Sequence, residues 1–201
     1  MSLTAGVVAV QGDVVEHAAA IERAGADHGG EITVHEVREA GIIPDCDFLA
    51  IPGGESTTIS QLIHSDGLDA EIRDHVAAGK PLLATCAGLI VVSSTANDDR
   101  VTPLELVDVT VERNAFGRQK DSFEAPLEVT GLDDPFPAVF IRAPAIETVG
   151  DAEILAEWDA RPVAVRDGPV VATAFHPELT MDSRLHELAF FESETASVPS
   201  T

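Results

Sequence analysis

The chain has 201 residues, 45% of them hydrophobic, and a formal net charge of −23 from 35 acidic and 12 basic side chains. This length and composition suit one globular domain with a full core and exclude an intrinsically disordered chain. So negative a field argues against nucleic acid or an anionic membrane as a partner. The acids are spread along the chain, which favours a salt-adapted surface and a halophilic source.

The chain also lacks the common signals for a membrane or secreted location. No apolar run approaches the ~20 residues that a transmembrane helix needs. The start, Met1 to Thr4, lacks the basic residues and apolar stretch of a signal peptide. Cys46 and Cys86 lie far apart and do not form a disulfide framework, so we expect Cys46 in the core and the protein in a reducing cytoplasm.

The first elements predict an α/β sheet. A β-branched run over 5–10 predicts a strand, and the turn Gln11-Gly12-Asp13 leads into a helix over 14–24 with Asp13 as its expected N-cap. A strand, a turn and a helix in this order are typical of α/β folds. We interpret His17 on this helix as a surface or hydrogen-bonded structural residue rather than a catalytic one.

A glycine pair follows the third predicted strand. Strands are expected over 32–37 and 46–51, and Pro52-Gly53-Gly54-Glu55-Ser56 then opens a helix over 57–64. Ligand sites of α/β sheets lie at such strand ends, and glycines free backbone N–H groups to face a ligand. A tight turn capped by Ser56 explains the same residues without a ligand, so this stretch alone leaves both interpretations open.

Cys86 lies between a short apolar strand over 82–84 and a second apolar run, which predicts a strand–turn–helix nucleophile elbow. The small residue Gly88 lets helix and strand approach closely. A helix N-terminus favours the thiolate, and the N–H of Ala87 points to where an oxyanion would form. The alternative is a buried structural cysteine, and this stretch by itself does not decide between them.

The second half of the sequence is rich in short β-stretches, which we expect to extend the first sheet and add a small antiparallel layer. No linker is evident, so we expect one domain over residues 1–191, with a final helix over 182–191 and a disordered tail over residues 192–201. The predicted strands are 125–130, 138–141, 153–158, 163–166 and 170–174.

The last of these strands runs into His176-Pro177-Glu178. In extended backbone, residues two apart face the same side, so His176 and Glu178 should project together. A carboxylate beside an imidazole fixes its tautomer and stabilises the imidazolium. With an elbow cysteine in the same chain, this pair favours catalysis over a lone loop histidine.

A Pro-Gly-Gly-Glu loop, a Thr-Cys-Ala-Gly elbow and a His-Pro-Glu end, in this order, resemble the class I (triad) glutamine amidotransferases. More narrowly, the chain resembles the glutaminase subunits of pyridoxal 5′-phosphate synthase, the PdxT/SNO family, nearly from end to end. The segments that carry this resemblance are Val10–Asp13, Pro52–Thr57, Thr85–Ile90, Arg113–Glu124, Phe140–Pro144 and Phe175–Thr180.

The resemblance implies a fold and a set of roles. The fold would be a three-layer, flavodoxin-like α/β fold with a mostly parallel sheet, helices on both faces and a small antiparallel β layer. Cys86 would be the nucleophile, His176 the general base and Glu178 its orienting acid. Further roles would be glutamine binding by Gly54, Glu55, Ser56, Arg113, Ile141 and Arg142, an oxyanion hole from Gly53, Gly54 and Ala87, and a partner surface at Gln11, Asp13 and Glu16.

The implied activity is hydrolysis of L-glutamine to L-glutamate and ammonia, with the ammonia passed to a synthase subunit for pyridoxal 5′-phosphate biosynthesis. No cofactor is implied, and no Cys/His spacing suggests a metal. Two alternatives remain at this point. One is another α/β cysteine hydrolase or peptidase, which gives no reason for the block Arg113 to Glu124. The other is a non-catalytic regulatory subunit of a synthase, which gives no reason for an intact triad.

Overall fold

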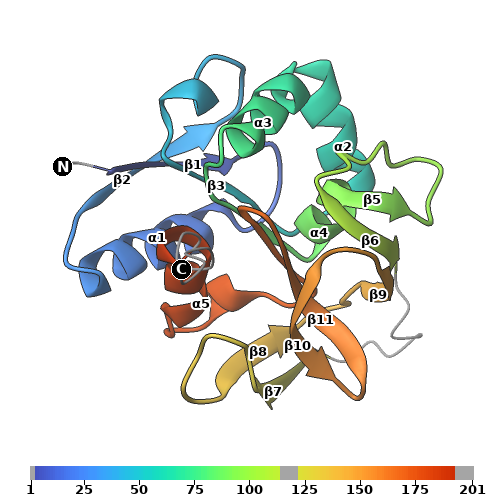
Figure 1. The fold of residues 1–201 in the computed structure, drawn as a ribbon. Coiled ribbons are helices and arrows are strands. Elements are labelled where there is room, and N and C mark those ends of the chain that lie inside the picture. Colours follow the sequence, from blue (N-terminus) through green and yellow to red (C-terminus); the bar gives the residue numbers. More distant parts are fainter. Residues whose placement is uncertain (1–2, 114–121, 193–201) are drawn as a thin grey trace, which may run out of the picture.

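A computed structural model describes residues 3–113 and 122–192 of the chain, which fold around one large sheet (Figure 1). This sheet has seven strands in the order β10-β11-β12-β4-β3-β1-β2. Their bounds are β1 Leu3–Val8, β2 Ile32–Val37, β3 Phe48–Ile51, β4 Leu82–Thr85, β10 Glu153–Trp158, β11 Arg161–Asp167 and β12 Val170–Thr173.

The sheet is parallel at its centre and antiparallel at one edge. The strands in the order β12-β4-β3-β1-β2 pair in parallel, whereas β10 with β11 and β11 with β12 pair antiparallel. Every residue of β3, β4 and β12 is buried, because helices cover both faces there. This double burial explains why their sequences show no alternation and are apolar apart from a final threonine in β4 and in β12.

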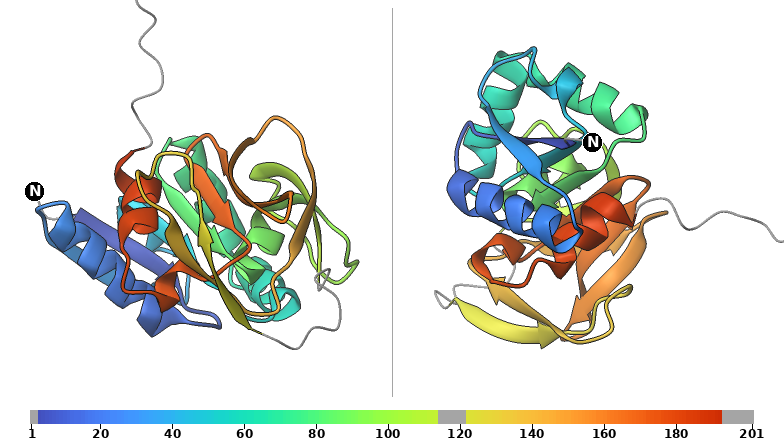
Figure 2. Two further views of the ribbon diagram at one scale, coloured as in Figure 1. Left: turned by 90° about the horizontal axis from the view of Figure 1, so that it is seen from below. Right: turned by 90° about the vertical axis from the view of Figure 1, so that its left-hand side faces the viewer.

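Helices form a layer on each face of the sheet, so the predicted three-layer α/β fold is confirmed. Helices α1 and α5 pack side by side on one face, and α2 and α3 lie on the other (Figures 1 and 2). The helices are α1 Val14–Asp27, α2 Ser56–Ser65, α3 Leu68–Ala77, α4 Ala87–Val92 and α5 Arg184–Phe191, with short 3-10 turns η1 Ile43–Asp45 and η2 Pro177–Leu179.

Two small sheets flank the antiparallel edge. One is β5-β6-β9 and the other is β7-β8, with bounds β5 Ser93–Ala96, β6 Val107–Glu112, β7 Phe123–Leu127, β8 Phe136–Phe140 and β9 Ala145–Val149. The expectation of antiparallel pairing holds for β6 with β9 and for β7 with β8, but β5 pairs with β6 in parallel. Strands β5, β6 and β9 are absent from the predicted strands, and the burial of β9 does not alternate along the strand.

Three local predictions need correction. Asp13 precedes α1 but its side chain makes no capping hydrogen bond, because the carboxylate turns toward His176 instead. Ser56 is the first residue of α2 rather than its cap. The backbone of His176 and Glu178 is not a continued strand: β12 ends at Thr173, and proline at position 177 begins the turn η2.

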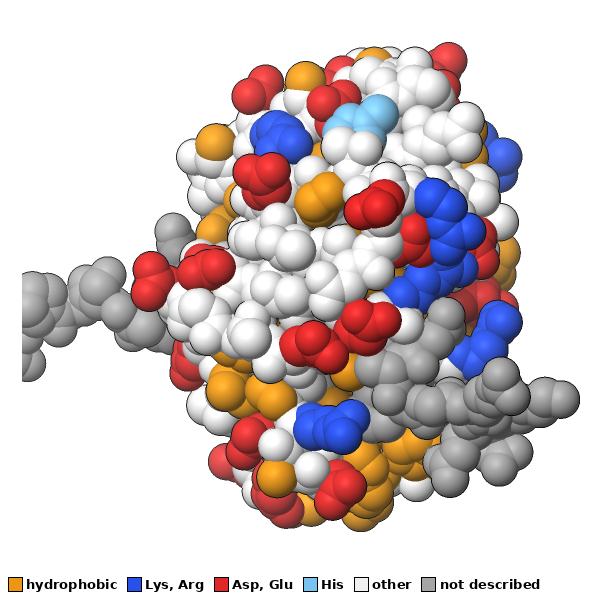
Figure 3. Space-filling view, turned by 90° about the vertical axis from the view of Figure 1, so that its right-hand side faces the viewer, with side chains coloured by type: hydrophobic (Ala, Val, Ile, Leu, Met, Phe, Trp, Pro, Cys, Tyr) orange, Lys and Arg blue, Asp and Glu red, His pale blue; other side chains and the backbone are white. Residues whose placement is uncertain are grey.

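The surface and core agree with the composition. Figure 3 shows acidic side chains spread over the face near β5 and β6 rather than gathered in one patch. Cys46 is fully buried and both cysteines are free, as expected. Among the described residues, no helix is long and apolar enough to cross a membrane. Residues 193–201 of the expected tail and residues 114–121 of the block Arg113–Glu124 lie outside the described residues.

Candidate active site

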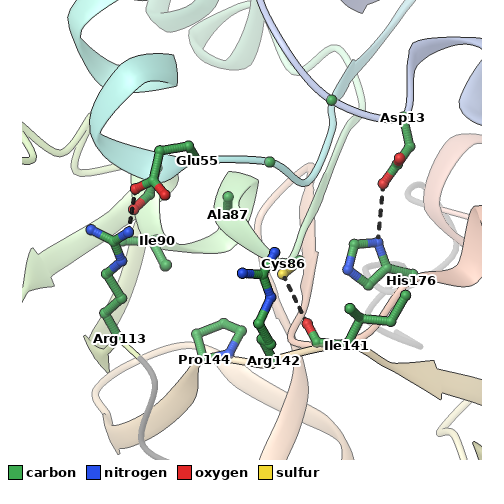
Figure 4. A pocket seen from close by; sticks show the side chains of 13 residues that line it. Asp13, Glu55, Cys86, Ala87, Ile90, Arg113, Ile141, Arg142, Pro144 and His176 are labelled. Carbon is green, nitrogen blue, oxygen red and sulfur yellow. Dashed lines mark hydrogen bonds and ion pairs between the residues drawn. The ribbon is translucent and has the colours of Figure 1, made fainter. Parts of the chain in front are cut away.

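A cavity of about 280 Å³ opens where the central parallel strands end (Figure 4). Strands β1, β3, β4 and β12 each lead from their carboxyl end into a segment near it, which is where α/β sheets bind ligands. The residues that line the cavity are Gly12, Asp13, Gly54, Glu55, Ser56, Cys86, Ala87, Ile90, Arg113, Ile141, Arg142, Pro144 and His176.

Cys86 occupies a strained turn between β4 and α4. Its backbone φ of 51° and ψ of −106° lie outside the regions that residues other than glycine favour. The backbone N–H of Cys86 donates to the carbonyl of Thr173 at 2.8 Å. A Cβ at Gly88 would lie 2.3 Å from the carbonyl oxygen of Ile51, so only glycine lets α4 approach β3 this closely. The predicted nucleophile elbow is therefore present, and its thiol faces the cavity.

His176 and Glu178 form a buried pair beside the elbow. Nδ1 of His176 lies 2.6 Å from Oε1 of Glu178, and their side chains are 6% and 0% exposed. The backbone N–H of His176 donates to the carbonyl of Val139 in β8, which anchors the segment. The turn η2 thus brings together the two side chains that a straight strand was expected to align.

The charges of this pair support each other. Burial disfavours a charged imidazole, but hydrogen bonds with Cys86 and Glu178 outweigh it and raise the pKa of His176 to about 10. Burial also opposes a charged Glu178, yet nearby His17 and the hydrogen bond from His176 lower the pKa of its carboxyl. The stable form is an imidazolium held against a carboxylate next to a cysteine, which is a catalytic arrangement for a thiolate nucleophile.

Of the residues expected at a partner surface, only Asp13 lines the cavity, while Gln11 and Glu16 lie close to Asp13 in the sequence. Oδ2 of Asp13 lies 3.6 Å from Nδ1 of His176, and the exposed Gln11 accepts a hydrogen bond from the N–H of Glu55 at 2.9 Å. Glu16 is exposed one turn further along α1. The loop that carries Gln11 and Asp13 therefore contacts both the imidazole and the glycine-rich segment.

The expected glutamine-binding residues surround the cavity mouth. Glu55 and Arg113 form an ion pair there, and the same guanidinium bonds Oδ2 of Asp98 at 3.0 Å. Gly54 and Ser56 line the cavity beside Glu55, whereas Ile141 and Arg142 line it opposite, with the Ile141 carbonyl 4.0 Å from Sγ of Cys86. No sequence pattern indicated a role for Asp98, which lies in a polar loop.

The expected oxyanion-hole residues lie next to the triad. A Cβ at Gly53 would be 2.6 Å from Cε1 of His176, so a side chain at this position would collide with the imidazole. Gly54, with φ of +140°, and Ala87 both line the cavity. The structure thus brings together all the predicted catalytic and glutamine-binding residues.

Of the two sequence interpretations of His17, the surface residue is wrong and the hydrogen-bonded structural residue agrees with the structure. His17 is fully buried, with Nε2 3.0 Å from Oγ1 of Thr85 and 3.4 Å from Oε2 of Glu178. A signal was present, because position 17 shares a helix face with the apolar residues Val14 and Ile21.

The only described group of residues with converging metal-ligand atoms is Asp13, His176 and Glu178, whose ligand atoms lie within 4.8 Å of one another. Nδ1 of His176 is already hydrogen-bonded to Glu178. This nitrogen is a donor to the carboxylate in the charged pair, and a donor nitrogen cannot ligate a cation.

Fold and site together define a class, the α/β enzymes that carry a cysteine on a nucleophile elbow with a histidine–carboxylate pair beside it. A solved structure described as a glutamine amidotransferase shares the fold with a TM-score of 0.83 and 43% identity, covering 92% of this chain and 96% of that one. The family model of the SNO glutamine amidotransferase family matches residues 7–195. The chain therefore belongs to the SNO glutamine amidotransferase family.

Curated proteins similar to this chain share one name, pyridoxal 5′-phosphate synthase subunit PdxT. The chain is 72% identical to the pyridoxal 5′-phosphate synthase subunit PdxT of Halobacterium salinarum, over 96% of this chain and 95% of that protein. It is 69% identical to the PdxT of Haloarcula marismortui, over 96% and 98%. These relatives come from halophilic archaea, in agreement with the salt-adapted composition. A glutamine amidotransferase of Thermotoga maritima, 11% identical with a TM-score of 0.63 over 96% and 92%, shares the fold.

Proposed function

We propose that this chain is the glutaminase subunit of a pyridoxal 5′-phosphate synthase. It would hydrolyse L-glutamine with Cys86, His176 and Glu178 and pass the ammonia to a synthase subunit. The observation that carries the proposal is the buried His176–Glu178 pair beside a strained elbow cysteine, in a chain of this family. The reducing cytoplasm is its proposed location, since its described cysteines are free.

The first half of the reaction forms a thioester. The Cys86 thiolate attacks the side-chain amide carbon of glutamine, and N–H groups of Ala87 and the Gly53–Gly54 segment hold the resulting oxyanion. The imidazolium of His176 gives its proton to the amide nitrogen, which leaves as ammonia when the carbon–nitrogen bond breaks. The raised pKa of His176 supports this role, because the ring carries the needed proton at neutral pH.

The second half restores the enzyme. His176, now neutral, takes a proton from water, and the hydroxide attacks the γ-glutamyl thioester. The carbon–sulfur bond breaks, glutamate leaves, and the thiolate and imidazolium return. Glu178 stays ionised throughout and holds Nδ1 of the ring.

The charges at the cavity mouth suit an amino acid. Arg113 can bind the glutamine α-carboxylate bidentately once it releases Glu55, and Glu55 then faces the α-ammonium group. A cavity of about 280 Å³ is near the lower limit for ligand pockets, ~300 Å³, which favours a small metabolite over a peptide. The partner surface would include Gln11, Asp13 and Glu16 next to Val15, a hydrophobic residue that is 72% exposed.

The test is a reconstitution with a synthase subunit in high salt. The wild-type chain should release ammonia from glutamine and support glutamine-dependent pyridoxal 5′-phosphate formation. Cys86→Ala should lose both while free ammonia still supports the synthesis and the complex still forms. Cys46→Ala is the matched control and should keep both activities. Ammonia release by Cys86→Ala would refute the assignment of Cys86 as the nucleophile. Peptide turnover without glutamine turnover would favour a peptidase.

A further inference from the structure

Behind the triad, Glu178 faces a second histidine. Oε1 of Glu178 binds His176, but within the described residues Oε2 is buried without a hydrogen bond to another residue. Nε2 of His17, on α1, lies 3.4 Å from this oxygen. Both side chains are fully buried, so solvent does not replace the contact, and a carboxylate oxygen without a donor would be costly.

The surroundings of His17 determine which of its nitrogens carries the proton. Nε2 also lies 3.0 Å from Oγ1 of Thr85, the residue before the nucleophile. If Nε2 carried no proton and accepted a hydrogen bond from the Thr85 hydroxyl, its lone pair would also face the negatively charged carboxylate oxygen. A proton on Nε2 instead lies close to both oxygens and is attracted to each, so electrostatics favours the Nε2–H tautomer.

The charge state of His17 suits a supporting role. Burial lowers its pKa more than Glu178 raises it, and the charged His176 lowers it further, against opposing effects of Asp13 and Glu16. His186 of α5, whose ring meets His17 edge-on at 5.8 Å, has its pKa lowered to about 3 by burial. Both rings behind Glu178 are therefore neutral, so His17 acts on the carboxylate through its N–H dipole, and the one cation paired with the carboxylate is His176.

We infer that His17 is a positioning residue of the triad, whose Nε2–H holds Oε2 of Glu178 so that Oε1 stays aligned with His176. This inference rests on the proposed glutaminase function. It links three segments that are distant in sequence: α1 through His17, the end of β4 through Thr85, and η2 through Glu178. The imidazole donates without adding a charge that would compete with His176 for the carboxylate.

The activity test compares two substitutions in the complex with the synthase subunit. His17→Leu removes the donor at similar volume and should lower kcat for glutamine about 10- to 100-fold with little change in KM, as for a lost hydrogen bond to a charged group. His17→Gln places an amide N–H2 near the Nε2 position and should restore most of kcat. Equal impairment of both variants would contradict the inference, as would an unchanged kcat in His17→Leu.

A control and a double-mutant cycle separate positioning from general packing. His75 is another buried histidine, bonded to the carbonyl of Pro81 at the opposite end of β4, so His75→Leu should leave kcat within about twofold. In a chain that already carries Glu178→Gln, adding His17→Leu should lower kcat less than about twofold further, because the carboxylate through which His17 acts is gone. Additive losses would overturn the inference.

A measurement on the wild-type chain needs no substitution. In a proton–nitrogen correlation spectrum of imidazole-labelled protein, His17 should appear as the neutral Nε2–H tautomer, and the Nδ1–H tautomer would overturn the inference. The outcome does not depend on the glutaminase assay. Failure of the proposed function would instead show as ammonia release by Cys86→Ala, so the two failures are distinguishable.

Discussion

The inner wall and the mouth of the cavity both carry ion pairs, but burial gives these pairs different properties. On the inner wall, Glu178 is 0% and His176 6% exposed, and both pKa values are shifted toward the charged forms. At the mouth, Glu55 is 46% and Arg113 22% exposed. A buried pair fixes protonation and geometry, whereas an exposed pair is weak and exchanges partners readily. The first arrangement suits proton transfer and the second suits substrate capture.

Low salt should have the largest effect, because it acts on the whole acidic surface. Reducing salt from about 1 M to about 0.01 M lengthens the Debye screening distance from about 3 to about 30 Å, so repulsion among the net 23 negative charges grows. We expect the chain to unfold during dialysis into low salt, as seen by circular dichroism. Full stability at low ionic strength would refute the salt-adapted interpretation of the surface.

Removing the charge of the inner pair should have the next largest effect. Glu178→Gln keeps the shape of the side chain but no longer stabilises the imidazolium, so kcat for glutamine should fall on the order of 10³-fold. Glu187→Gln is the matched control, because Glu187 accepts a hydrogen bond from Ser183 away from the cavity. If Glu178→Gln kept more than a tenth of the wild-type kcat, the carboxylate would not be the orienting acid.

Removing the cation at the mouth should affect binding more than chemistry. Arg113→Ala should raise KM for glutamine about 10- to 100-fold with a smaller change in kcat, because it removes a contact made equally in ground and transition states. Arg100→Ala is the control, since Arg100 binds the same Asp98 but its side chain is 71% exposed. A large fall in kcat at constant KM would assign Arg113 to the chemical step instead.

A titration tests the buried pair without measuring activity. The His176 ring should titrate near pH 10 by nuclear magnetic resonance, and in Cys86→Ala its pKa should fall because a hydrogen bond that raises it is lost. The unfolded value is about 6.5, so this group stabilises the fold fully below that pH and the contribution is lost as pH rises through about 10. An unchanged His176 pKa in Cys86→Ala would show that Cys86 does not stabilise the charged imidazole.

The sequence predicted what depends on neighbouring residues and missed what depends on packing between distant ones. The elbow at Cys86 and the pair of His176 with Glu178 follow from local patterns, and so do the central strands and most helices. The contact of His17 with Glu178, and of Asp98 with Arg113, arises only when the sheet brings separate segments together. Strands β5, β6 and β9 lie in the second half, where the sequence pattern predicts fewer strands than form; the burial of β9 shows no periodic pattern.

During the proposed reaction, Sγ of Cys86 becomes covalently bonded to the side-chain amide carbon of glutamine. A glutamine-mimicking electrophile offers the most direct test, applied to the complex with its synthase subunit and followed by peptide mass spectrometry. One adduct per chain on Cys86, prevented by excess glutamine and accompanied by loss of ammonia release, is the predicted result. Labelling of Cys46 instead, or continued ammonia release by a chain fully modified at Cys86, would contradict it.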